Sequence, residues 1–96
     1  SAIKWFANLT GASGATVKSY NVSGSSRSAT GRYTITLSSK MSDADWVPGA
    51  CAQDTAQTTV TVTAISTNTI SVLCEAGGGA DKDPTQVYVW GMGDLG

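Results

Sequence analysis

Among the residues of this chain, the acidic side chains are the best candidates for a metal site or a catalytic site. They form two Asp-x-Asp pairs, Asp43 with Asp45 and Asp81 with Asp83. Calcium takes about six to eight oxygen ligands, and neither pair continues into the acid spacing of an EF-hand loop. Glycoside hydrolysis needs two facing carboxylates, one of them in an apolar setting, and nothing in the sequence indicates such a pair. We therefore expect no metal site and no hydrolytic carboxylates.

Nucleophilic catalysis and zinc binding both lack a necessary partner. Histidine is absent, so no imidazole is available to activate a serine or a cysteine. Cys51 and Cys74 are the only cysteines, and two thiolates cannot complete a structural zinc site. They can form a disulfide only if neighbouring strands carry them, and we favour two small buried thiols. The sequence thus predicts no catalytic residue, no enzyme activity and no cofactor.

The charged residues argue against partners that are held by charge. The net charge is −1 and the six Lys and Arg residues are scattered, without a run that would neutralise adjacent phosphates. Nucleic acid is therefore not an expected partner. Membrane insertion is not expected either, since no apolar stretch approaches the roughly 18 residues that span a bilayer. The start, Ser1 to Lys4, lacks the apolar core of a signal peptide, and we expect a domain boundary there.

Apolar residues recur with the period of β-strands along the whole chain. Tyr33, Ile35 and Leu37 alternate with polar residues, as in a strand with one buried side. No stretch of eleven or more residues keeps a helical period. Strands are expected over residues 3–8, 15–22, 32–38, 45–52, 57–66, 70–75 and 85–92. These seven strands predict an all-β fold: one small antiparallel β-sandwich over residues 1–96, Ig-like or jelly-roll-like.

Local signals refine this layout. The Ser-rich segment 23–30 and the Gly-rich segment 77–84 are expected to be surface loops. Pro48 cannot donate to a ladder, so its strand should be an edge strand or bulged there. A three-residue turn at 67–69 would join two strands into a hairpin. The apolar pattern then predicts that Ala64 faces Val72 and that Val62 faces Cys74.

The last strand is apolar on both sides in a chain with a thin core. Val87 and Val89 lie on one side of it, and Tyr88, Trp90 and Met92 on the other. Leu, Ile, Val and Phe together number only 17 of the 96 residues, which leaves little to cover both sides. We therefore expect a neighbouring subunit to supply the second cover.

Tryptophans and loops remain as candidates for recognition. Trp46 and Trp90 are predicted in the core or an interface, and Trp5 at the join to an upstream stalk, with sugar stacking as the alternative for all three. Loops on a rigid β-scaffold usually carry binding, although each of them can also be a plain connector. The candidate contact residues are Arg27, Asp43, Gly78, Asp81, Lys82 and Asp83.

Six short motifs occur in a fixed order along nearly the whole chain: Lys4–Asn8, Gly11–Gly14, Tyr20–Ser23, Gly31–Leu37, Met41–Val47 and Asp83–Val89. This order resembles a small domain that recurs at the C-terminal end of tail fibres and related virion proteins of tailed bacteriophages. Usual members have Pro after the Met and an Asn-Tyr pair in the same turn. Here Ser42 and Asp45-Trp46 take those places, which alters the exposed edge of the turn.

The resemblance implies a terminal β-domain, commonly trimeric, on a fibrous virion protein that contacts the host cell. It carries over no catalytic residue. Phage proteins fold in the reducing bacterial cytoplasm, which favours free thiols. We expect a homotrimeric fibre tip whose loops bind a bacterial surface receptor, a glycan or an outer-membrane protein, by multivalent attachment. The alternatives are a structural or trimerisation domain without a receptor, and a carbohydrate-binding module, which would need exposed aromatic residues on a flat face.

Overall fold

The computed structural model describes residues 2–96, so Ser1, the first residue of the predicted domain, lies outside the described part. Eight strands follow one another: β1 (Ile3–Thr10), β2 (Thr16–Tyr20), β3 (Val22–Ala29), β4 (Arg32–Leu37), β5 (Val47–Gln53), β6 (Thr58–Ile65), β7 (Thr69–Ala76) and β8 (Gln86–Met92). Within residues 2–96 no helix is long and apolar enough to cross a membrane.

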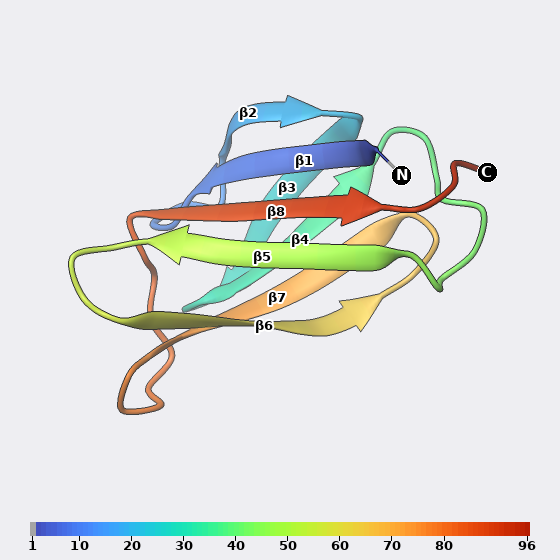
Figure 1. Cartoon of the computed structure of the whole chain (residues 1–96). Helices are drawn as coiled ribbons and strands as arrows, with labels where there is room; N and C mark the ends of the chain where they lie inside the picture. Colours follow the sequence, from blue (N-terminus) through green and yellow to red (C-terminus); the bar gives the residue numbers. More distant parts are fainter. Residues whose placement is uncertain (1) are drawn as a thin grey trace.

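The strands form two four-stranded antiparallel sheets packed face to face (Figure 1). Sheet A has the order β2-β1-β8-β5, and sheet B has the order β3-β4-β7-β6. The prediction of a small antiparallel β-sandwich is confirmed, with eight strands in place of about seven. Pro48 lies on β5 at the edge of sheet A, as predicted, and pairs with Gly91 of β8.

The strand order in the two sheets is that of an immunoglobulin sandwich, except that the chain starts at a different strand, as in a circular permutation. Constant-type immunoglobulin sandwiches place strands A-B-E-D in one sheet and C-F-G in the other. Here β3-β4-β7-β6 corresponds to A-B-E-D, and β5-β8-β1 corresponds to C-F-G with β2 added beyond it. The first strand therefore fills the place of the last one, and both chain ends lie at the same end of the sandwich, where Ile3 pairs with Met92.

The Ser-rich segment 23–30 is mostly a strand, so the loop prediction there was wrong. Asn21 adopts a φ of 55° and turns the chain, after which β3 pairs with β4 along its length. Small polar residues suit this edge strand, because one edge of β3 is open to solvent and β4 supplies the hydrogen-bond partners along the other. Arg27, expected on a loop, lies on this strand opposite Tyr33. Tertiary pairing overrides the weak strand propensity of the segment.

The β6–β7 hairpin differs from its predicted register by two residues. Val62 faces Val72 and Val60 faces Cys74, while Ala64 faces Ser71. The turn accounts for one residue of this difference, because Ile65 pairs with Ile70 across residues 66–69, and the bulge between Val62 and Ala64 accounts for the other. Apolar residues still share one side, so the pattern alone could not distinguish the two registers.

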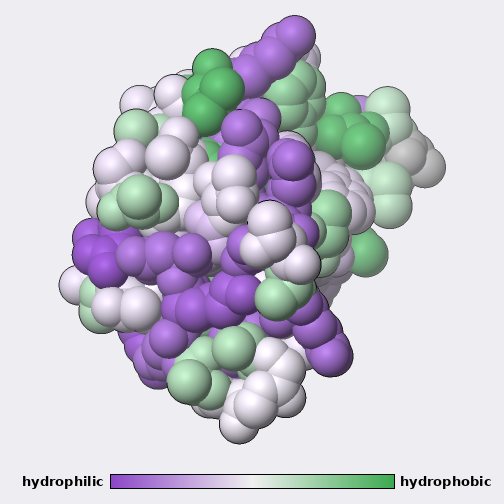
Figure 2. Space-filling view, turned by 90° about the vertical axis from the view of Figure 1, so that its left-hand side faces the viewer, coloured by the Kyte–Doolittle hydropathy of each residue, from purple (hydrophilic) through white to green (hydrophobic). Residues whose placement is uncertain are grey.

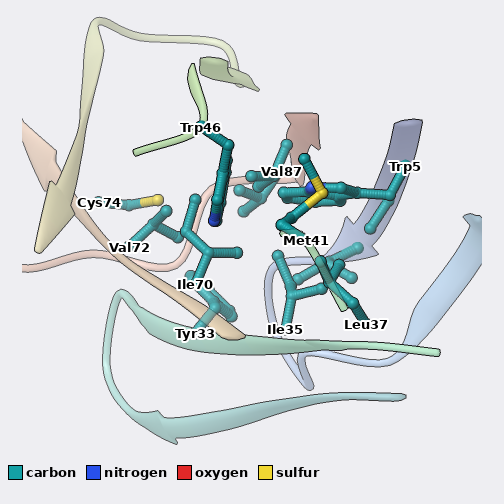
Figure 3. Close-up of a cluster of buried hydrophobic side chains, with 13 residues drawn as sticks. Trp5, Tyr33, Ile35, Leu37, Met41, Trp46, Ile70, Val72, Cys74 and Val87 are labelled. Atoms are coloured by element: carbon teal, nitrogen blue, oxygen red, sulfur yellow. The ribbon is translucent and has the colours of Figure 1, made fainter. Parts of the chain in front are cut away.

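Two tryptophans meet in the core, between the sheets (Figure 3). Trp5 is fully buried and Trp46 is 5% exposed, and their rings pack edge to face with centroids 5.7 Å apart. The prediction for Trp46 is confirmed, and the placement of Trp5 at the join to a stalk was wrong. Trp5 lies opposite Gly91 on β8, and its indole occupies the space that a side chain at Gly91 would need.

The outer side of β8 is partly exposed in this chain. Val87 and Val89 are buried between the sheets, while Tyr88, Trp90 and Met92 are half-buried on the outer side of sheet A. A covering subunit therefore stays a prediction.

Both cysteines are free, and they lie on different sheets. Cys74 is buried as expected, but Cys51 on β5 is exposed. Its neighbour Ala50 packs against the core, and successive residues of a strand point to opposite sides, so Cys51 points away from the core.

Candidate binding surfaces

The loops gather at two opposite ends of the sandwich. The terminal pole holds both chain ends, Asn21 and the segments 38–46 and 66–68, joined by contacts such as the Met41 N–H donating to the Thr67 carbonyl. The loop pole holds residues 11–15, 30–31, 54–57 and 77–85. Figure 2 looks onto the loop pole, where hydrophilic residues run across the surface. Four of the six predicted contact residues, Gly78, Asp81, Lys82 and Asp83, belong to the loop pole. Arg27 lies on β3 and contacts this pole through Asp83, and Asp43 belongs to the terminal pole.

Asp83 ties the two sheets together at the loop pole. Its carboxylate accepts hydrogen bonds from Arg27 Nε at 3.1 Å and from the Gly31 N–H at 2.8 Å, and Arg27 Nη2 lies 2.9 Å from Oδ2. The Tyr33 hydroxyl donates to the Gly11 carbonyl at 2.7 Å and lies 3.1 Å from Asp83 Oδ1. Gly31 has a φ of 71°, and a Cβ there would run into the Cys74 and Lys82 carbonyls. We call this group of five residues (Gly11, Arg27, Gly31, Tyr33 and Asp83) the Asp83 cluster.

The electrostatics of the cluster favour the ionised carboxylate. Burial works to raise the pKa of Asp83, but the hydrogen bonds from Arg27, Gly31 and Tyr33 outweigh it and hold that pKa below its ordinary value. Burial, followed by the nearby Asp83 carboxylate, raises the pKa of the Tyr33 hydroxyl. Arg27 and Asp83 therefore satisfy each other as a partly buried ion pair, with side chains 29% and 24% exposed.

The rest of the 77–84 segment is anchored by two further ion pairs. Lys82 Nζ lies 2.9 Å from Asp54 Oδ2, and both side chains are mostly buried. The hydrogen bond from Lys82 is the main cause that lowers the pKa of Asp54. Arg32 and Asp81 make a looser, exposed contact at 3.9 Å. Three consecutive residues of the loop thus pair with β3, β4 and the β5–β6 connection.

The remaining candidates have different surroundings. Gly78 is exposed at the loop tip, and a Cβ there would meet no atom within 4 Å. Asp43 lies on the exposed 38–46 loop and accepts a hydrogen bond from the Asp45 N–H at 2.8 Å. Within residues 2–96, no three His, Cys, Asp or Glu side chains come together as a metal site. Gly78, Asp43 and Asp81 are thus the exposed residues among the predicted contact residues.

The motifs that carried the family resemblance meet in space. Gly31 and Tyr33 of one motif contact Asp83 of another, 52 and 50 residues away. The Asn21 side chain donates to the Lys4 and Ser39 carbonyls and accepts from the Ser39 N–H, so it joins the terminal pole. These contacts give the motif residues a structural role in the fold.

The outer face of sheet A carries a feature that the sequence did not predict. Tyr20, Phe6, Trp90 and Gly49 are direct cross-strand neighbours on β2, β1, β8 and β5. Three aromatic side chains therefore form a continuous row across the sheet, which we call the aromatic row. The sequence contains one indication of an apolar outer face. Trp5 and Phe6 are neighbours, so one of them must lie on each side of β1. The row itself depends on a strand order that no local pattern specifies.

Comparison with known protein families, curated proteins and solved structures found no significant match to this chain.

Proposed function

We propose that this chain is a receptor-attachment domain of a tailed-phage tail fibre. In this proposal the domain is part of the virion, is made in the bacterial cytoplasm and acts without catalysis. Its terminal pole joins the rest of a fibrous protein, and its loop pole faces a receptor on the bacterial surface. Three copies in a homotrimer, and several fibres on a particle, would raise the avidity of a weak single contact.

The proposal rests mainly on one observation: the chain ends lie at one end of the sandwich, and four of the six predicted contact residues lie at the other. An attachment domain needs this polarity, because its binding surface must point away from the fibre. The ion pairs of Arg27, Asp54 and Arg32 hold the 77–84 loop in one conformation, which lowers the entropy lost on binding. The exposed tip at Gly78 and the loose Arg32–Asp81 pair are then the groups best placed to meet a receptor.

A structural domain without a receptor is the second candidate. The observation that favours it is the group of large apolar side chains exposed near the terminal pole: Ile3, Phe6, Tyr20, Val47 and Leu95. Such side chains are common in interfaces between subunits. In that case sheet A would pack against other copies or other virion proteins.

Adsorption competition separates the two candidates. Bacteria that the phage infects are incubated with the purified domain at increasing concentration, and the rate of phage attachment is measured. The attachment role predicts a dose-dependent block, whereas the structural role predicts unchanged attachment at a saturating dose. Sedimentation of the same sample tests the homotrimer, and a monomer at micromolar concentration contradicts that part of the proposal.

A further inference from the structure

Two of the three rings of the aromatic row lie nearly parallel to each other on the outer face of sheet A. Phe6 and Tyr20 are stacked with ring centroids 6.2 Å apart and an angle of 26° between their planes. Tyr20 is 58% exposed and Phe6 is 38% exposed, so both rings are accessible to a ligand. Directly paired residues of antiparallel strands lie on the same side of the sheet, which places Trp90 on this surface too.

Trp90 lies over the backbone of its neighbour on β5. A Cβ atom at Gly49 would be 2.5 Å from Trp90 Nε1 and closer still to Cε2 and Cζ2 of the same ring. The indole therefore covers the place of the missing side chain and is supported by the sheet below it. A ring held in this way needs little further ordering when a ligand stacks on it.

Hydrogen-bonding groups follow the aromatic row toward the loop pole. The Tyr88 hydroxyl donates to Gln53 Oε1 at 2.7 Å, and Gln86 Oε1 lies 3.0 Å away from it. Amide and phenol groups beside an apolar platform match a saccharide, which has C–H groups on the faces of its rings and hydroxyls around their edges.

The charged residues of sheet A favour a ligand with negative charge. The four strands of this sheet contain no Asp or Glu, and their only charged residues are Lys4 and Lys18. The seven acids lie outside the strands, except Glu75 on β7 of sheet B. Two copies packed face to face on sheet A would bring lysines together with no acid to pair them, which disfavours self-association. A partner with acidic groups complements this surface.

From these observations we infer that the outer face of sheet A binds an acidic polysaccharide. Sugar rings stack on Tyr20, Phe6 and Trp90, and a carboxylate or similar group pairs with Lys18, which lies beside the row opposite Asn8. This site is separate from the loop pole and does not depend on the attachment proposed for that pole.

Affinity electrophoresis tests the site with defined probes. The 96-residue chain is run in native gels that contain alginate, hyaluronan or polygalacturonate, with dextran as the neutral probe. Retardation by at least one acidic polysaccharide is expected, and little by dextran. Tyr20→Ser and Lys18→Glu should each weaken that retardation about tenfold. Leu95→Ser removes an exposed apolar side chain outside sheet A, and Lys40→Glu makes the same charge change outside it, so neither should have an effect.

Other results overturn the inference. Retardation by none of the three acidic probes excludes the site, and equal loss in the control variants shows that binding is not located on sheet A. If sedimentation shows an oligomer that Tyr20→Ser dissociates, the face is an interface between copies. A second measurement uses the unaltered chain. Trp90 is half-buried whereas Trp5 and Trp46 are buried, so a bound polysaccharide should protect the fluorescence of Trp90 from iodide. Unchanged quenching at a saturating dose also contradicts the inference.

Discussion

The carboxylate of Asp83 accepts a hydrogen bond from the backbone N–H of Gly31 at 2.8 Å, across 52 residues of sequence. This contact joins the loop before β8 in sheet A to the turn between β3 and β4 in sheet B. It explains why a Gly-x-Tyr motif and an Asp-Pro motif occur together in one chain. The two motifs form one structural unit at the loop pole.

Loss of the Asp83 charge is expected to destabilise the fold. Asp83→Asn keeps the shape of the side chain but weakens its contact with Arg27, and should lower the free energy of unfolding by about 2 kcal/mol. Asp81→Asn is the matched control, because its contact with Arg32 is exposed and 3.9 Å long, and should cost less than about 0.5 kcal/mol. Urea unfolding of both variants measures the difference, and equal midpoints would argue against a structural role of the cluster.

Stability should fall in acid in a way that depends on Asp83. The pKa of this carboxyl is lower in the folded chain than in the unfolded one, so the folded state binds fewer protons. Its contribution is complete above the unfolded pKa of about 3.9 and is lost as the pH falls through the lower folded value. Thermal unfolding between about pH 5 and pH 2 should show a shallower decline in Asp83→Asn than in the unaltered chain. Parallel declines would exclude this assignment.

Two glycines beside tryptophans should respond differently to the same change. In Gly91→Ala the new methyl group meets the fully buried Trp5, which has no room to move, and a loss of about 1–3 kcal/mol is expected. In Gly49→Ala the methyl group meets Trp90 at the surface, and the indole can swing toward solvent at a cost below about 1 kcal/mol. Chemical denaturation compares the two variants, and the opposite ranking would be inconsistent with the described faces of sheet A.

The two thiols should differ in reactivity. Cys51 is exposed, while Cys74 is buried, and burial followed by the nearby Asp83 carboxylate raises the pKa of Cys74 to about 11. Titration with a thiol reagent at pH 8 should label one cysteine per folded chain and two after denaturation. Mass mapping of the label should identify Cys51. Rapid labelling of both in the folded chain would show that the core opens readily or is packed differently.

The sequence predicted those parts of the fold that depend on local alternation. Segments such as 32–38 and 57–66 became strands close to their expected bounds, because one of their sides is buried. Segment 23–30 was missed because β4 supplies the partners that make it a strand. The bulge between Val62 and Ala64 could not be inferred, since both registers keep apolar residues together.

The candidate surfaces were harder to predict than the strands. Arg27, Asp81, Lys82 and Asp83 were chosen because they were expected on surface loops, yet each pairs with another residue of the chain. Such pairing depends on contacts between distant segments. The aromatic row likewise exists only because β2, β1 and β8 are adjacent. Trp90 was identified as a possible platform, but Phe6 and Tyr20 gave no local sign that they would lie beside it.

Binding of the labelled domain to host bacteria tests the attachment role of the loop pole most directly. Gly78 and Gly24 both have open space around them and lie on different parts of the molecule, so Gly78→Trp and Gly24→Trp form a matched pair. We expect that the unaltered domain binds the cells, that Gly78→Trp weakens binding about tenfold, and that Gly24→Trp leaves it unchanged. Binding that is absent, or that both variants reduce equally, would contradict attachment through the loop pole.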